Sequence, residues 1–257
     1  MGKVIAVFNQ KGGVGKTTTN VNLSASIGKM GKKVLVLDLD PQGNTTSGYG
    51  IEKQEVENTI YEVMLDGVDI REAILPTEFE NVDTIASATE LSGAEIELTN
   101  MDKREYVLKN AIESVRKDYD YIFIDCPPSL GMLTINCLTA VDSVLIPIQC
   151  EYYALEGVSQ LMETIKLVKS RLNPNIEIQG VVLSMFDGRA NLSIQVVEEV
   201  KRYFKGSVYT TLIPRNVRLA EAPSHGKPVI YYDARCRGAE AYMDLAEEFI
   251  DLEEDII

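Results

Sequence analysis

A glycine-rich segment between an apolar run and a helical pattern restricts the fold more than any other feature of the sequence. Residues 4–8 read as a buried strand, and residues 10–18 follow as Gln-Lys-Gly-Gly-Val-Gly-Lys-Thr-Thr. Glycines let backbone N–H groups turn inward around a phosphate chain without Cβ clashes. A helix that begins near Lys16 adds the positive end of its dipole. The strand–loop–helix order therefore predicts a P-loop nucleotide site rather than a plain glycine-rich turn.

Two side chains of this loop have definite expected roles. Lys16 should neutralise the β and γ phosphates of ATP, and the Thr17 hydroxyl should be a ligand of Mg²⁺. The other residues expected around the phosphates are Lys11, Gly12, Gly13, Val14, Gly15 and Thr18. ATP and magnesium are therefore the predicted ligands of this segment.

Apolar strand-like runs alternate with helical patterns along most of the chain. The expected strands cover residues 4–8, 33–37, 121–124, 144–148 and 178–183. One expected helix follows the glycine-rich loop and stops near Gly31, and others cover residues 104–117, 155–171, 194–204 and 239–252. This alternation predicts a doubly wound α/β fold with a mainly parallel sheet and helices on both faces. We expect one domain over residues 1–257, with residues 45–93 as an irregular acidic lobe over the sheet edge.

The composition excludes several classes of protein. No apolar run approaches the ~20 residues of a membrane-spanning helix, and the N-terminus lacks the regions of a signal peptide. The four cysteines form no Cys-x-x-Cys pair and the chain has one histidine, so we expect no zinc site. We expect instead reduced, mostly buried thiols in a cytoplasmic protein.

The net charge of −14 is distributed unevenly. Residues 51–120 carry 18 acidic and 7 basic side chains, and residues 244–257 carry 7 acidic and no basic ones. Residues 187–237 carry 9 basic and 5 acidic side chains, a net charge of +4. Because salt screens distant charges, this stretch can bind phosphate although the whole chain is acidic. A solvated surface of mixed charge is the alternative interpretation.

Three carboxylates stand where predicted strands end. Asp38 and Asp40 follow a buried strand, at the edge where α/β sheets bind ligands. Two residues apart on an extended segment, they are expected to point the same way. Asp125 ends another apolar strand and should hold Mg²⁺ through a water molecule. Turn formation or capping at the strand ends is the structural alternative.

The loop departs from the common pattern G-x-x-x-x-G-K-[ST], because Gln10 stands at its first glycine position and Lys11 follows. The resulting pattern, K-G-G-x-G-K-[ST], resembles the deviant Walker A motif of the ParA/MinD family of ATPases. Residues 38–44 (Asp-Leu-Asp-Pro-Gln-Gly-Asn) match the family's second motif, and residues 124–128 (Ile-Asp-Cys-Pro-Pro) match its Walker B segment. Residues 213–226 look like the chromosomal ParA branch, often called Soj. The similarity covers nearly the whole chain.

The resemblance implies further roles for residues of the site. Lys11 would reach across a homodimer to the partner's nucleotide, where a second cation acts as an arginine finger does. The residues alone fit a solvent-facing lysine equally well. Asp40 would orient the attacking water, and Asp38 would lie near the Mg²⁺ shell. Pro214 and Asn216 would contact adenine, although sequence alone favours a turn and a helix cap there.

The resemblance also implies a DNA-partitioning ATPase. ATP-bound homodimers would coat nucleoid DNA without sequence specificity, and a ParB-type partner would trigger hydrolysis and release. A MinD-like positioning ATPase on a membrane or a protein scaffold is the alternative, but anionic lipid would repel the acidic C-terminal segment, so we expect no membrane partner. An electron-transfer enzyme like nitrogenase iron protein would need cluster cysteines between subunits. Neither Cys126 nor Cys137 stands where such a ligand is expected.

Two arginines of the basic stretch are the expected DNA contacts. Arg189 precedes Asn191, an expected cap of the following long helix, and Arg218 follows Asn216, an expected cap of a short one. A cation at a helix N-terminus opposes the helix dipole, which favours a role in phosphate binding. The Soj resemblance implies DNA contacts at these same two positions. Without it, two solvated arginines offset by nearby acids are the simpler interpretation. A wider patch would add Arg202, Lys205, Lys227 and Arg235.

Overall fold

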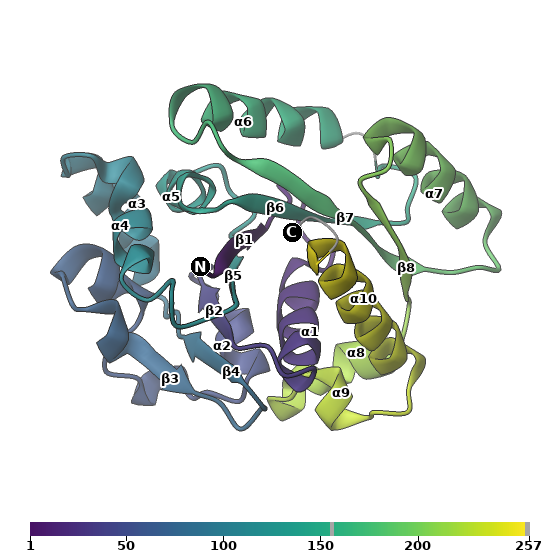
Figure 1. The fold of residues 1–257 in the computed structure, drawn as a ribbon, viewed down its shortest axis with the longest axis horizontal. Coiled ribbons are helices and arrows are strands. Elements are labelled where there is room, and N and C mark those ends of the chain that lie inside the picture. Colours follow the sequence, from purple (N-terminus) through teal and green to yellow (C-terminus); the bar gives the residue numbers. More distant parts are fainter. Residues whose placement is uncertain (155–156, 255–257) are drawn as a thin grey trace.

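The computed structural model describes residues 1–154 and 157–254, in which eight strands form one sheet between two layers of helices (Figure 1). The strand order is β3-β4-β2-β5-β1-β6-β7-β8, and β3 alone runs antiparallel to its neighbour. The strands are β1 (Lys3–Val7), β2 (Val34–Asp38), β3 (Ile74–Pro76), β4 (Val82–Ile85), β5 (Tyr121–Asp125), β6 (Ser143–Gln149), β7 (Glu177–Phe186) and β8 (Val208–Pro214). The helices are α1 (Lys16–Lys29), α2 (Asn44–Gly48), α3 (Leu91–Glu97), α4 (Val107–Glu113), α5 (Met132–Ala140), α6 (Val158–Arg171), α7 (Asn191–Phe204), α8 (Val217–Glu221), α9 (Val229–Tyr232) and α10 (Arg237–Glu254).

The apolar strands are buried from both sides because each face of the sheet carries its own core. Along β1, Val4 and Ala6 belong to one apolar cluster, and Ile5 and Val7 belong to the other. This follows from the alternation of side chains along a strand. Residues of α3, α4, α5, α6 and α7 complete the first cluster, and residues of α1, α9 and α10 complete the second. In Figure 1, α5 and α6 accordingly lie on one side of the sheet, and α1 and α10 lie on the other.

The fold class predicted from the sequence is confirmed, and most predicted elements are present. The helix after the glycine-rich loop ends at Lys29, two residues before Gly31. The helix predicted over residues 155–171 is observed as α6, whose first two predicted residues lie outside the described residues. The helix predicted over residues 104–117 is shorter in the structure, where α4 spans only Val107–Glu113. None of the helices in the described ranges combines the length and the apolar character that crossing a membrane requires.

Several elements were not predicted. Residues 45–93 are irregular, but they also contribute β3 and β4, which form one edge of the sheet instead of only covering it. The strand at the other edge, β8, and the buried helix α5 were also missed. Both edge regions lack the continuous apolar run on which the strand predictions relied.

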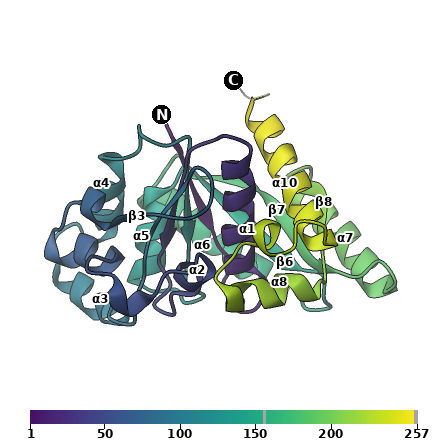
Figure 2. The ribbon, with the colours of Figure 1, turned by 90° about the horizontal axis from the view of Figure 1, so that it is seen from below.

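One carboxylate binds the edge strand β8 to the last helix. Glu248 of α10 accepts hydrogen bonds from the backbone N–H and hydroxyl of Thr210, at 2.6 and 2.9 Å. It accepts the same pair of bonds from Thr211, at 2.9 and 2.7 Å. Figure 2 shows α10 between α1 and β8, the two elements against which it packs. The C-terminal helix therefore holds one end of the sheet in place.

The thiols are arranged as the composition suggested. All four cysteines are free, and Cys126, Cys137 and Cys150 are buried, whereas Cys236 is half-buried. Burial raises the pKa of the Cys150 thiol to about 11. Because the thiolate is the reactive form, Cys150 is a packing residue rather than a nucleophile.

Candidate functional site

The glycine-rich loop lies at the carboxyl end of β1 and has the backbone shape of a phosphate cradle. Gly13 and Gly15 have φ values of 73° and 89°, a left-handed conformation that favours glycine. Between them, the Val14 carbonyl accepts a 2.8 Å hydrogen bond from the Ser184 hydroxyl of β7. The loop is therefore fixed from a strand that is distant in sequence, and its shape is held in place for phosphate oxygens.

Lys16 occupies the start of α1, inside this loop. The residue is only 8% exposed, and its Nζ donates a 3.2 Å hydrogen bond to the Lys11 carbonyl. Burial lowers the pKa of Lys16, and the negative charges of Asp125 and Asp40 oppose that effect. The ammonium group thus lies among carboxylates at the loop, where a triphosphate would complete its charge neutralisation.

Lys11 is held by its backbone, and the residue is half-exposed. Its N–H donates a 3.0 Å hydrogen bond to Asn9, and the Asn9 amide donates at 2.8 Å to the Pro147 carbonyl of β6. Within residues 1–154 and 157–254, the Lys11 ammonium makes no ion pair. Its expected contact with a partner's nucleotide stays a prediction.

Asp125, at the end of β5, accepts hydrogen bonds from two hydroxyl groups. Its Oδ2 accepts hydrogen bonds of 2.7 Å from Thr17 and 2.8 Å from Thr45. Its Oδ1 is buried and has no hydrogen-bond partner among the described residues, which is costly for a carboxylate oxygen. A water molecule in the shell of a bound Mg²⁺ would supply that partner. Thr17 and Asp125 therefore fit magnesium, which keeps several waters and takes few protein ligands.

Asp38 lies opposite Asp125 on the neighbouring strand and is fully buried. Its Oδ2 accepts 2.8 and 2.7 Å hydrogen bonds from the N–H and hydroxyl of Thr46, and its Oδ1 accepts a 3.2 Å bond from the Asp40 N–H. Burial raises the pKa of Asp38, and the charge of Asp125 raises it further. Burial also raises the pKa of Asp125, against the effect of its two hydroxyl bonds. A nearby divalent cation would favour the ionised form of both.

Asp40 stands on the loop between β2 and α2, half-buried beside the other charged groups. Its carboxylate accepts a 3.0 Å hydrogen bond from the Gln42 N–H, and its carbonyl accepts a 2.8 Å bond from the Ser87 hydroxyl. The Ser87 N–H in turn donates at 2.9 Å to the Thr46 hydroxyl. Asp40 is thus positioned through Ser87 by the same threonine that holds Asp38.

A cavity of about 230 Å³ opens beside the phosphate loop. Gly15 and Thr18 belong to its wall, so it continues the loop. Pro214 and Asn216 also line it, where adenine was expected, and Met185 and Leu219 add apolar surface. A small cavity with a largely apolar lining suits a nucleotide base, although the adenine contact itself stays a prediction.

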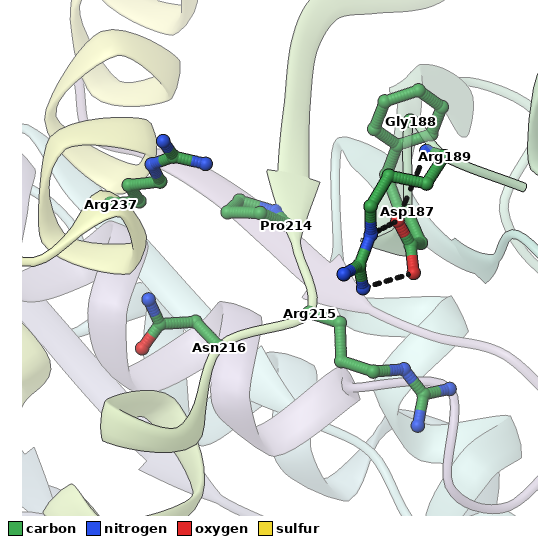
Figure 3. Close-up of a pocket in the computed structure, with 8 residues that line it drawn as sticks. Asp187, Gly188, Arg189, Pro214, Arg215, Asn216 and Arg237 are labelled. Carbon is green, nitrogen blue, oxygen red and sulfur yellow. Dashed lines mark hydrogen bonds and ion pairs between the residues drawn. The ribbon is translucent and has the colours of Figure 1, made fainter.

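A second cavity of about 580 Å³ shares Pro214, Arg215 and Asn216 with the first. Its remaining lining residues are Phe186, Asp187, Gly188, Arg189 and Arg237. Figure 3 shows Arg237 and Arg189 on opposite sides of Pro214, and Arg215, which follows the end of β8, extends away from Arg237 on the side of Arg189. Three arginines from three segments therefore surround one opening.

The two arginines expected to contact DNA have different surroundings. The Arg189 side chain is 92% exposed and makes a two-pronged ion pair with Asp187, with both N···O distances at 2.9 Å. Arg218 is held between two acids, Glu221 at 2.7 Å and Asp233 at 3.2 Å. Nearby acids therefore offset both charges, as the alternative interpretation anticipated, and DNA contact stays a prediction.

One expected cap is present and the other is wrong. The Asn216 side chain accepts a 2.8 Å hydrogen bond from the Arg218 N–H and caps α8, as predicted. Asn191 instead lies inside the first turn of α7, Ala190 occupies the cap position, and no side chain caps that end. The helix begins three residues before the predicted range of 194–204, and one residue earlier than a cap at Asn191 would give. The preceding backbone forms a turn in which the Ala190 N–H bonds to the Asp187 carbonyl.

Sequence reasoning missed three hydroxyl residues that hold the carboxylates: Thr45, Thr46 and Ser87. The two threonines open α2 directly after residues 38–44. A pair of hydroxyls just behind a carboxylate motif was a signal that could have been used, since helix N-termini present N–H groups to anions. Ser87 carried no such signal, because only the pairing of β4 with β2 brings it near Asp40.

Comparison with known proteins gives consistent relatives. A family model described as an AAA domain matches residues 2–178. The chain is 61% identical over 248 residues to the sporulation initiation inhibitor protein Soj of Bacillus subtilis, covering 96% of this chain and 98% of the relative. It is 52% identical to the chromosome partitioning protein ParA of Myxococcus xanthus, covering 97% of this chain and 88% of the relative.

A solved structure supports the same fold. It is described as cobyrinic acid a,c-diamide synthase from Mycobacterium smegmatis with a bound ATP analogue and magnesium. The TM-score is 0.84 at 36% identity, and the match covers 96% of this chain and 93% of the other. That protein thus carries an ATP analogue and magnesium on the fold seen here.

Proposed function

The chain belongs to the family that contains Soj and the ParA chromosome-partitioning proteins, and from this premise we propose that it is an ATPase that partitions DNA. Its identity to those two relatives exceeds its 36% identity to the diamide synthase. The observation that supports the ATPase most directly is the cluster of Lys16, Thr17 and Asp125, next in sequence to Gly15 and Thr18, which line the cavity expected to hold the base.

ATP binding follows from the arrangement of the loop. Backbone N–H groups of residues 11–18 surround the phosphates, and Lys16 neutralises the β and γ groups. Thr17 and Asp125 would hold Mg²⁺, which would supply positive charge to offset that of the phosphates. The base occupies the cavity lined by Pro214 and Asn216.

Hydrolysis needs a positioned water and a compensating charge. Asp40 orients the attacking water. Asp38 and Ser87 hold its backbone just after β2, and the Gln42 N–H donates to its carboxylate. Lys11 of the partner subunit supplies the second cation at the transferring phosphoryl group, as an arginine finger does. Supplying this cation in trans couples hydrolysis to homodimer formation, so one subunit alone hydrolyses ATP slowly.

The ATP-bound homodimer binds nucleoid DNA through its phosphates. Arg189 and Arg218 provide guanidinium groups, which pair well with phosphate oxygens. Contacts to the DNA backbone carry no sequence information, so binding is non-specific and weakens as salt rises. A ParB-type partner then stimulates hydrolysis and releases the dimer from DNA.

A DNA titration with ATP, with ADP and without nucleotide tests this function. A duplex of random sequence should bind tightly only with ATP. Arg189→Glu and Arg218→Glu should each weaken DNA binding strongly and leave ATP binding and dimerisation unchanged. Wild-type protein that ignores DNA under all three conditions would refute the proposal.

The rival function, a positioning ATPase on a membrane, receives less support from the surface. The last described turns of α10 carry Glu247, Glu248, Asp251, Glu253 and Glu254, which anionic lipid repels. Sedimentation of the ATP-bound protein with anionic vesicles distinguishes the two functions. Partition into the vesicle fraction would favour the membrane role.

A further inference from the structure

The arginine-lined cavity shares a wall with the cavity expected to hold the base. This shared wall can couple binding of the base to binding of DNA. We propose that Arg189, Arg215 and Arg237 form one phosphate-binding surface for duplex DNA, and that a base in the adjacent cavity orders this surface. The proposal rests on the proposed function, and it adds two contact residues and a coupling within a single subunit.

The charge of this surface favours a polyanion. Among the residues that the structure describes, three of the lining residues are arginines and one, Asp187, is acidic. Arg215 makes an exposed ion pair with Glu151 at 3.3 Å, and Arg237 makes no ion pair within the described parts of the chain. Exposed ion pairs are weak, because water and salt screen them. A phosphate can therefore displace Glu151 or Asp187 from its arginine.

The geometry favours a phosphate backbone over an isolated anion. The cavity measures about 580 Å³, and its three exposed arginines come from three segments of the chain. Separate guanidinium groups around a concave surface can contact successive phosphates of one strand. Arg218 lies outside the lining of this cavity, held by Glu221 and Asp233, so it extends the surface rather than forming its centre.

Two chain segments run directly from the base cavity to two of the three arginines, Arg189 and Arg215. In the first, Ser184 and Met185 line the base cavity, and Arg189 follows four residues after Met185. In the second, Pro214 and Asn216 line the base cavity, and Arg215 lies between them. A base that contacts either wall therefore touches a residue next to, or a few residues from, an arginine of the phosphate surface.

The two segments are also joined to each other. The Arg215 N–H donates a 3.1 Å hydrogen bond to the Phe186 carbonyl, so movement of one segment displaces the other. Met185, one residue earlier, has a φ of 53°, a conformation that is strained for a residue with a side chain. Strained residues of this kind cluster at ligand-binding sites and switch segments. We therefore expect a bound base to restrict the motion of both segments, residues 184–189 and 214–216.

Equilibrium DNA binding of the full chain tests the surface. The variants are Arg215→Ala and Arg237→Ala, and Arg171→Ala is the matched control, an exposed arginine at the end of α6 that does not line the cavity. With ATP and a random duplex, fluorescence anisotropy at several salt concentrations gives the log–log slope. Each test variant should lower that slope by about two units, one per subunit of the dimer, and bind roughly tenfold more weakly at low salt. Arg171→Ala should match the wild type.

The outcomes separate this inference from the function on which it rests. If wild-type protein shows no ATP-dependent DNA binding, the proposed function fails first. If the wild type binds and both test variants keep its slope and affinity, the arginine surface is wrong and the function stands. Preference for anionic vesicles over duplex, lost in the same variants, would overturn the choice of DNA.

Hydrogen exchange tests the coupling without DNA and without a dimer. Magnesium-ADP is added at protein concentrations where sedimentation shows a monomer. Amides of residues 185–189 and 213–216 should become protected together with those of residues 11–18. Protection confined to residues 11–18 would overturn the coupling within the subunit.

Discussion

The hydroxyl group of Thr17 donates a 2.7 Å hydrogen bond to the Oδ2 atom of Asp125. This bond joins the first turn of α1 to the end of β5. Because the hydroxyl gives its hydrogen to the carboxylate, its lone pairs remain for a cation. Lys16 precedes Thr17 on the same turn, so one short segment presents both a positive charge and a magnesium ligand to the phosphates.

Replacing Lys16 with alanine should abolish tight ATP binding. The β and γ phosphates lose the cation of their own subunit, and a charged hydrogen bond of about 3 kcal/mol corresponds to roughly a hundredfold loss of affinity. Isothermal titration of ATP measures it, with Lys29→Ala at the exposed end of α1 as the control. Unchanged affinity in Lys16→Ala would be incompatible with the P-loop assignment.

Asp40→Ala should separate ATP binding from hydrolysis. Lys16, Thr17 and Asp125 remain in this variant, so ATP binding and dimerisation should persist, while the water loses its orienting group. The dimer should then accumulate on DNA, and phosphate release should fall by roughly 10²-fold or more. If the variant hydrolyses ATP at the wild-type rate, Asp40 has another role.

The rate of hydrolysis per subunit should rise with protein concentration. Lys11 can act only on the nucleotide of a partner, so turnover requires the dimer. Wild-type turnover should stay below the ~1–100 s⁻¹ of kinases. Lys11→Ala should remove the concentration dependence while leaving ATP affinity nearly unchanged. A wild-type rate that is constant across the dimerisation range contradicts the role in trans.

Thr46→Val should destabilise the fold more than its small change in shape suggests. It removes a hydrogen bond to buried Asp38 and leaves the Ser87 N–H without its acceptor. Each buried group left unsatisfied costs about 1–3 kcal/mol. Urea unfolding measures the free energy, and Thr89→Val at an exposed position is the control. Equal midpoints for the two variants would show that the Thr46 hydroxyl contributes little.

Magnesium should stabilise the protein more at neutral than at acidic pH. The pKa values of Asp38 and Asp125 are raised to about 7 and about 6 in the folded chain, from 3.8. As pH rises through that window without metal, the unfolded chain loses protons first, so the free energy of unfolding falls. A cation reverses this loss by favouring the ionised pair. Thermal unfolding with and without magnesium-ADP should therefore show a larger gain at about pH 7.5 than at about pH 5.5.

The central strands were predictable because burial on both faces demands continuous apolar residues. Residues 4–8 and 121–124 show this pattern, and the structure places them as the neighbours β1 and β5. The helix α5 was not predicted, because burial also removes the pattern by which a helix is detected. Most of its residues are buried, so it has no polar face and no helical periodicity to detect. A short strand such as β4, between β3 and β2, has too few residues to form a pattern.

The residues of the site were predictable where a sequence motif assigns each of them a role. The phosphate loop combines a fixed spacing with a fixed backbone shape, so Lys16 and Thr17 could be identified from sequence. Arg215 and Arg237 could not, because they lie 22 residues apart in sequence and only the fold places both around one cavity. The role of a charged side chain depends on the residues around it, and sequence spacing does not show which distant residues the fold brings together.

The hydrogen bonds between Glu248 and the two threonines, Thr210 and Thr211, also affect how readily the protein aggregates. They occupy backbone N–H groups of an edge strand that another chain could otherwise use to extend the sheet into an aggregate. Although burial acts against it, these bonds lower the pKa of Glu248 below its ordinary value of 4.5, so the carboxylate keeps its charge in mildly acidic solution. Stronger acid protonates it and exposes the edge. Near the isoelectric point of about 4.6 the net repulsion between molecules vanishes, but Glu248 still carries its charge there and keeps the edge of β8 covered.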